Sequence, residues 1–134
     1  MARCPPMPAC GAPPKIPRLA VVPMVLEARG LDVTPGMIAL FRKAGQDRAV
    51  AALEVIYAEE VGHVAYGSKW FNFLCGRDNA DPKERFHRLV RTYFHSRLKP
   101  PFNAEKRAEA GLPPDFYWPL TEDLPPDPAN LPGF

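Results

Sequence analysis

The stretch DRAVAALEVIYAEEVGHVAYGSKWFNFLC, residues 47–75, decides the fold of this chain. Its apolar residues recur at the 3, 4, 7 spacing of one helical stripe, which consists of Leu53, Ile56, Gly67, Phe71 and Leu74. The stretch therefore predicts a single amphipathic helix closed by Gly76. At a rise of about 1.5 Å per residue the helix would be roughly 43 Å long, so it needs other helices as neighbours.

Two ionisable residues, Glu60 and His63, interrupt this stripe at its middle. Their i, i+3 spacing directs both side chains to the same side of the helix, which the apolar pattern predicts to be buried. A buried carboxylate and a buried imidazole need a partner, and a metal ion held between them would supply one. Glu59 is a rival ligand at i, i+4 to His63, but it lies far from the centre of the stripe, which favours a solvated side chain.

The segment before the long helix offers a second carboxylate. Residues 17–29 predict a short helix that contains Pro23 and ends at Gly30. Glu27 lies on one face of this otherwise apolar segment, so it is a candidate third ligand, and the alternative is a solvated carboxylate at a helix end. Thr34 and Pro35 predict the start of a separate helix over residues 35–44.

The segment after the long helix predicts further helices and no strand. Asp81 can cap a helix that starts at Pro82 and that Lys99-Pro100-Pro101 ends, and Asn103 can cap a short helix through Ala110. Residues 115–120 are apolar enough to dock on the bundle. The predicted fold is all-α.

Proline placement divides the chain into three parts. The prolines are concentrated in its ends, which predicts a disordered Pro-rich leader over residues 1–16, a helical region over 17–120 and an acidic Pro-rich tail over 121–134. Seventeen Lys and Arg against 15 Asp and Glu give a formal charge of +2, which does not predict nucleic-acid binding. The three cysteines form no disulfide framework, and no segment is long and apolar enough for a signal peptide or a membrane span. We therefore expect a cytoplasmic protein.

Several motifs resemble one known family. They are Leu26-Glu27-Ala28-Arg29-Gly30-Leu31-Asp32-Val33-Thr34-Pro35-Gly36, Glu54, Tyr57, Glu60-Val61-Gly62-His63, Trp70-Phe71 and Arg97-Leu98-Lys99-Pro100-Pro101-Phe102-Asn103. Together they resemble a bacterial ferritin-like family of di-iron carboxylate type and uncharacterised function, over about residues 18–120. The resemblance implies a ferritin-like bundle in which Glu27 is the lone glutamate of the third helix, and Glu60 with His63 is the pair on the fourth.

The resemblance also implies that this chain corresponds to a C-terminal half, because the family carries two earlier helices with an equivalent ligand set. One copy then supplies two carboxylates and one imidazole, and a homodimer would restore the ligands of a di-metal site. We expect iron or manganese at Glu27, Glu60 and His63, and a non-haem oxidase or hydroxylase activity. Tyr57 and Tyr66 are candidates for hydrogen bonds to the ligands, with packing at a helix edge as the alternative.

Two other functions stay open at this stage. The chain is an inactive fragment of such a protein, or it binds nucleic acid through a basic segment. The cations of that segment are Arg85, Arg88, Arg91, Arg97, Lys99, Lys106 and Arg107. We favour a solvated basic helix face over nucleic-acid binding, because Phe86, Tyr93 and Phe94 occupy the core stripe of the same helix.

Overall fold

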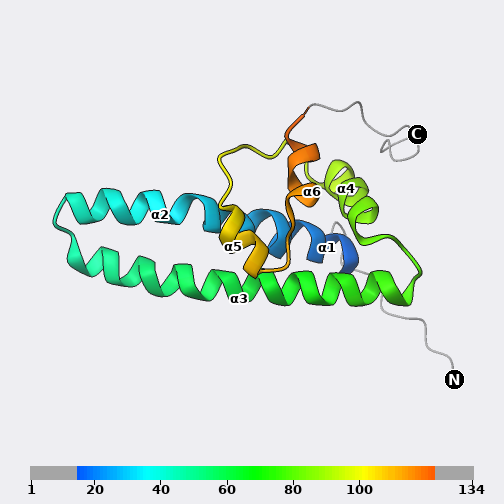
Figure 1. The fold of residues 1–134 in the computed structure, drawn as a ribbon, viewed down its shortest axis with the longest axis horizontal. Coiled ribbons are helices and arrows are strands. Elements are labelled where there is room, and N and C mark those ends of the chain that lie inside the picture. The colour runs from blue at the N-terminus through cyan, green and yellow to red at the C-terminus, as the bar shows by residue number, and fades with distance from the viewer. Residues whose placement is uncertain (1–14, 123–134) are drawn as a thin grey trace, which may run out of the picture.

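A computed structural model describes residues 15–122, and this part of the chain forms a bundle of helices without a strand (Figure 1). The predicted all-α fold is confirmed. The elements in chain order are α1 (Lys15–Val21), the π-helix η1 (Val22–Glu27), α2 (Ala28–Lys43), α3 (Asp47–Arg77), α4 (Pro82–Tyr93), α5 (Ala104–Glu109), α6 (Pro114–Tyr117) and the 3-10 helix η2 (Trp118–Thr121).

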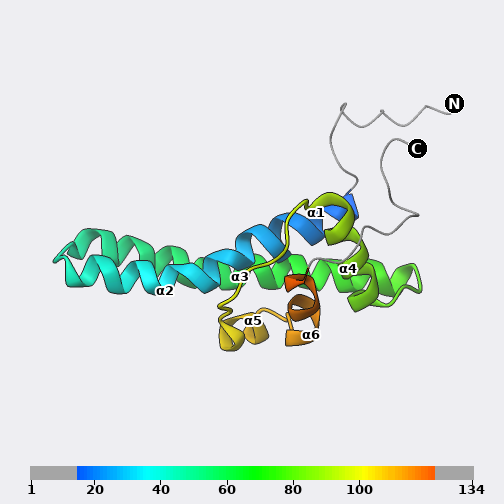
Figure 2. The ribbon, with the colours of Figure 1, turned by 90° about the horizontal axis from the view of Figure 1, so that it is seen from above.

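The architecture rests on a hairpin of two long antiparallel helical rods. The first rod runs from α1 through η1 and α2, and the second is α3 (Figure 1). A turn over residues 44–46 joins them, and Gly45 adopts the positive φ of +74° that favours glycine there. Figures 1 and 2 both show α4, α5 and α6 gathered along one part of the hairpin, while α2 and α3 continue alone toward the turn. We call the part of the hairpin that continues alone toward the turn, residues 33–56, the arm.

The prediction of a helix break between Gly30 and Pro35 is wrong, because α2 continues through both residues. Pro35 has no N–H group, so the carbonyl of Leu31 loses its donor in the helix. The side chain of Asn103 supplies another donor, with Nδ2 3.0 Å from the Leu31 oxygen. Thr34, predicted as a cap, is instead a buried residue inside the helix. A contact from 72 residues further along the chain thus supports a proline in the helix interior.

The core lies where the carboxyl-terminal helices cover the hairpin. Phe71 of α3, Phe86 of α4 and Phe116 of α6 form its aromatic centre, with ring centroids 6.0 Å apart for the first pair and 5.4 Å for the second. Such spacings are typical of favourable aromatic pairs. Residues 115–120 dock on the bundle as predicted, since Phe116, Tyr117 and Leu120 are buried.

The capping predictions for α4 and α5 are confirmed. The Asp81 side chain accepts a hydrogen bond from the Glu84 amide, and Asn103 accepts one from the Lys106 amide. However, α4 ends at Tyr93, earlier than predicted, because Phe94 takes an extended conformation. Tyr93, predicted to face the core, is 43% exposed.

The helices of the described residues extend slightly beyond the predicted helical region. The first helix begins at Lys15 and η2 ends at Thr121, so the helical region is longer than residues 17–120. The rest of the predicted leader and tail, residues 1–14 and 123–134, lies outside the described residues. Among the helices of residues 15–122, none combines the length and the apolar character that crossing a bilayer requires.

Candidate metal centre

The three predicted ligands come together between the two rods of the hairpin, near the middle of α3. Glu27 is the last residue of η1, and Glu60 and His63 lie on α3. One ligand atom from each residue lies within 4.8 Å of the others. No other group of three His, Cys, Asp or Glu residues within 15–122 meets this criterion. The three residues named from the sequence thus lie together, although two separate helices carry them.

A close helix contact fixes the two rods beside the cluster. Gly67 of α3 faces Pro23 of η1, and a Cβ atom placed at Gly67 would lie 2.3 Å from the proline Cγ. Only glycine permits this approach without a shift of the backbone or of the proline ring. In η1 the Ala28 amide reaches back five residues to the carbonyl of Pro23, which is the hydrogen bond of a π-helix. Short π-helical segments are frequent at functional sites, and this one carries Glu27 at its end.

Glu60 is the least satisfied side chain of the cluster. Its Oε2 atom is buried and has no hydrogen-bond partner. Burial raises the pKa of the Glu60 carboxyl above its ordinary value, the charge of Glu27 raises it further, and His63 partly opposes the shift. A Cβ atom at Gly30 would lie 3.6 Å from the Glu60 Cδ, so the first rod closes directly over the carboxylate. A cation at this point would neutralise a carboxylate of which one oxygen has no other partner.

The prediction that both α3 residues face the core is correct only in part. Glu60 is half-buried, whereas His63 is exposed and Ile56 of the predicted stripe is 48% exposed. The residues of α3 that are buried are Val50, Val64, Gly67, Ser68, Phe71 and Cys75. The buried stripe is therefore displaced around the helix, and Glu60 lies nearer to it than His63 does.

The cluster opens into a surface groove of about 320 Å³. Its lining residues are Leu19, Pro23, Glu27, His63, Tyr66 and Gly67. A small molecule entering this groove would meet Glu27 and His63 directly, because both belong to its wall. The centre thus combines a buried carboxylate oxygen with two ligands that face the opening.

The neighbouring candidates have other positions. Glu59 is exposed, as predicted. The Tyr57 hydroxyl accepts a hydrogen bond from Asn103 Nδ2 at 2.7 Å, and no hydrogen bond joins it to Glu27, Glu60 or His63. Tyr66 lines the groove and is 65% exposed. Neither tyrosine donates a hydrogen bond to a ligand in the described part of the chain.

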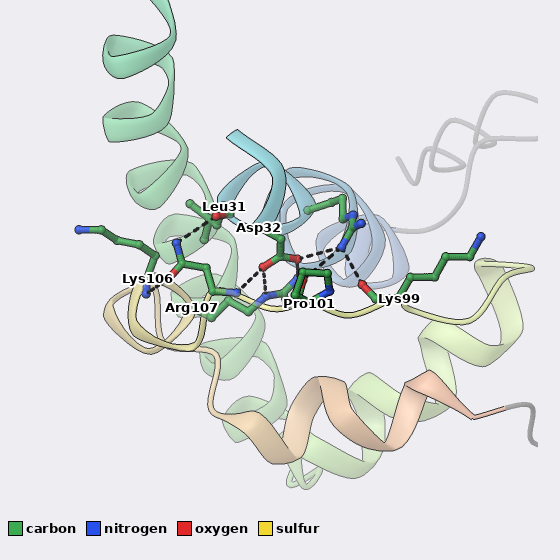
Figure 3. Close-up of polar contacts among 8 residues, drawn as sticks. Leu31, Asp32, Lys99, Pro101, Lys106 and Arg107 are labelled. Atoms are coloured by element: carbon green, nitrogen blue, oxygen red, sulfur yellow. Dashed lines mark hydrogen bonds and ion pairs between the residues drawn. The ribbon is translucent and has the colours of Figure 1, made fainter. Parts of the chain in front are cut away.

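Sequence reasoning missed a buried ion pair on the opposite side of the first rod. Arg107 of α5 donates from Nε and Nη2 to the two Asp32 oxygens, at 2.9 and 2.6 Å (Figure 3). The side chains are only 3% and 1% exposed. The backbone amide of Asn103 donates a hydrogen bond to the same carboxylate at 2.8 Å. We call Asp32, Asn103 and Arg107 the latch, since they fasten the carboxyl-terminal segment to α2.

The signal for the latch was present in the sequence but was assigned elsewhere. The predicted helix limits leave Asp32 between two helices, and Arg107 belongs to the basic segment that is predicted to be solvated. The structure buries Arg107, and it pairs Arg85 with Asp78 at 3.0 Å. Lys106 in turn pairs with Glu109 at 3.3 Å, so at least three of the seven cations of the basic segment are engaged within the protein. Nucleic-acid binding stays an untested prediction.

The comparisons with known proteins agree with each other. Residues 14–118 match the family described as "Protein of unknown function (DUF455)". An uncharacterised protein of Haemophilus influenzae is 36% identical over 95 residues, which are 71% of this chain and 33% of the relative. The match thus spans about a third of the length of that relative. No solved structure matches this chain. Because the family match covers most of its length, the chain belongs to this family of proteins of unknown function.

Proposed function

We propose that this protein binds iron or manganese through Glu27, Glu60 and His63. The observation that carries the proposal is the buried Glu60 Oε2 without a partner, which lies in a cluster with a second carboxylate and an imidazole. Carboxylate and imidazole ligands suit both metals, and protein groups that supply only three ligands leave positions open for water or substrate. In its ligand types and their placement on two antiparallel helices, the centre is similar to ferritin-like carboxylate centres.

The chemistry that follows from this proposal is oxidation or hydroxylation, since such metals activate dioxygen when bound. Glu60 and Glu27 would neutralise the ion, and His63 would set its position at the groove wall. The protein itself would contribute the half-buried environment and the opening toward substrate.

We further propose that two copies complete the centre. One chain supplies two carboxylates and one imidazole, fewer than a di-metal site uses. The arm exposes apolar residues that would suit a second arm in a two-fold contact: Val33, Met37, Leu40, Val55 and Ile56. These five residues are 38% to 67% exposed, and apolar residues that gather on one surface mark contact sites.

The decisive experiment measures metal content per chain together with the solution mass. We expect bound iron or manganese in the natural protein, and loss of at least ten-fold in affinity for Glu60→Ala. Glu59→Ala is the matched control, because Glu59 is an exposed neighbour on the same helix. Full metal retention in Glu60→Ala would refute the ligand assignment, and a metal-free monomer that is stably folded would refute the proposed function.

A further inference from the structure

The groove at the metal centre does not end there. A second hollow of about 530 Å³ shares Leu19, Pro23 and Tyr66 with it, so the two adjoin. The second hollow adds Val22 and Trp70, which are both 41% exposed, and its lining is predominantly apolar. The surface between α1 and α3 therefore presents an apolar channel that leads away from Glu27 and His63.

The far end of the channel is basic. A third hollow of about 420 Å³ shares Lys15 and Leu74 with the second. It is also lined by Arg77, Arg85 and Arg88, so four cations lie around one opening. Asp78 pairs with Arg77 at 2.9 Å and with Arg85 at 3.0 Å. One carboxylate against four cations leaves a net positive end, which favours an anion there.

We propose that this channel binds an elongated single-chain amphiphile, with an anionic carboxylate or phosphate group at the Lys15 and Arg88 end. Its apolar chain would lie against Val22 and Trp70, and its far end would reach the metal centre. Twelve residues of helix separate Lys15 from Glu27, a span of roughly 18 Å at the usual rise per residue. The proposal rests on the proposed function only for the reaction at the chain end, not for binding.

Charge argues that a second copy of this chain, which is proposed to complete the metal centre, does not by itself neutralise the basic end of the channel. In one orientation the copy would bring its own cluster of Lys15 and Arg88 against the same cluster. In the other it would bring the hairpin turn, where Lys43 and Arg48 outnumber Asp47. Both arrangements oppose like charges, whereas an anionic headgroup neutralises them. An apolar chain in turn gains free energy by covering Val22 and Trp70, because their apolar surface leaves water.

The test is calorimetric titration of the full-length, metal-free protein with dodecanoate and, separately, with dodecyltrimethylammonium. These probes share an apolar chain of equal length and differ in headgroup charge. We expect dodecanoate to bind at least ten-fold more tightly. Fluorescence of Trp70, followed in a Trp118→Phe background, should change on binding, because Trp70 lines the channel.

Matched variants separate the two parts of the channel. Arg88→Glu should weaken dodecanoate binding at least ten-fold, while Arg91→Glu, an exposed arginine of the same helix that does not line the channel, should not. Val22→Asp should abolish binding, while Val55→Asp in the arm should not. Circular dichroism verifies that each variant folds. If Val22→Asp does not fold, the comparison of Arg88→Glu with Arg91→Glu alone tests the proposal.

Other results would overturn the proposal. Equal affinity for both amphiphiles would contradict the basic end, and insensitivity to Arg88→Glu would contradict the placement. Binding only to phosphatidylglycerol vesicles, or only to RNA, would assign the surface to another partner. A dimer that Val22→Asp dissociates, without dodecanoate binding, would make the channel a protein contact.

Failure of this proposal is distinguishable from failure of the proposed function. Dodecanoate binding that persists in Glu60→Ala supports the channel whether or not the natural protein holds metal. Metal retention without dodecanoate binding would refute the channel and leave the metal centre in place.

Discussion

Breaking the buried pair of the latch should cost more stability than any surface change in this protein. The Asp32 carboxylate accepts two hydrogen bonds from Arg107 and one from the Asn103 amide. Because the Asp32 and Arg107 side chains are 1% and 3% exposed, water cannot replace a lost partner. The Asp32→Asn variant leaves a guanidinium buried between the rings of Phe102 and Tyr117 without its counter-charge.

We expect Asp32→Asn to lower the free energy of unfolding by about 3–5 kcal/mol, the range for a buried pair that loses one partner. The double variant Asp32→Leu with Arg107→Met removes both charges and should be close to neutral, since buried apolar replacements often are. The exposed pair Arg42 and Glu54, 2.7 Å apart with side chains 60% and 55% exposed, is the control. Glu54→Ala should cost no more than about 1 kcal/mol.

Urea unfolding followed by circular dichroism measures all four proteins, with the natural chain as reference. The reasoning depends on burial of the charges rather than on their attraction. It fails if Asp32→Asn costs as little as Glu54→Ala. It also fails if the double variant loses as much stability as Asp32→Asn, because the buried pair would then be net favourable relative to its apolar replacement.

Three further changes test other parts of the structure. The pKa of Glu60 in the folded protein is raised above its ordinary 4.5. The metal-free protein should therefore lose stability as pH rises from 4.5 to the folded pKa, because the folded state holds the proton more tightly. Thermal unfolding measures this dependence, and Glu60→Gln should remove it. Gly67→Ala should destabilise by about 1–3 kcal/mol through overpacking, whereas Gly62→Ala on the open side of the same helix should be neutral or stabilising. Asn103→Ala should cost about 1–3 kcal/mol, and less in a Pro35→Ala background, where the helix regains its own donor; equal costs in both backgrounds would contradict the pairing.

The sequence correctly predicted a helix start wherever a neighbouring side chain caps the free backbone amides. Asp81 and Asn103 cap helices that begin next to them, and the structure shows both capping bonds. Gly30 and Pro35 carry equally clear stop and start signals, yet α2 runs through them. The donor that makes this possible comes from Asn103. A contact between distant segments is not visible in the local pattern, and it outweighed the local preference.

The cluster of three candidate ligands was predictable in its membership but not in its exposure. Glu27, Glu60 and His63 were identified from their spacing and neighbours, and the structure brings their ligand atoms together. The predicted stripe assumed that α3 is covered on the side that Ile56 and His63 share. Within the described residues the first rod and the carboxyl-terminal helices cover a neighbouring side, so both residues are exposed.

The candidate metal centre and the latch meet in three consecutive residues of α2, which gives the correction at Gly30 a wider structural meaning. Gly30 lies against the Glu60 carboxylate, the Leu31 carbonyl accepts from Asn103, and Asp32 holds Arg107. A turn at this point, as the local signals indicate, would detach the first rod from Glu60 and remove the close wall of the site. The helix remains continuous because the carboxyl-terminal segment supplies the donor that Pro35 removes. The distant Asn103 therefore supports the geometry of a centre that it does not touch.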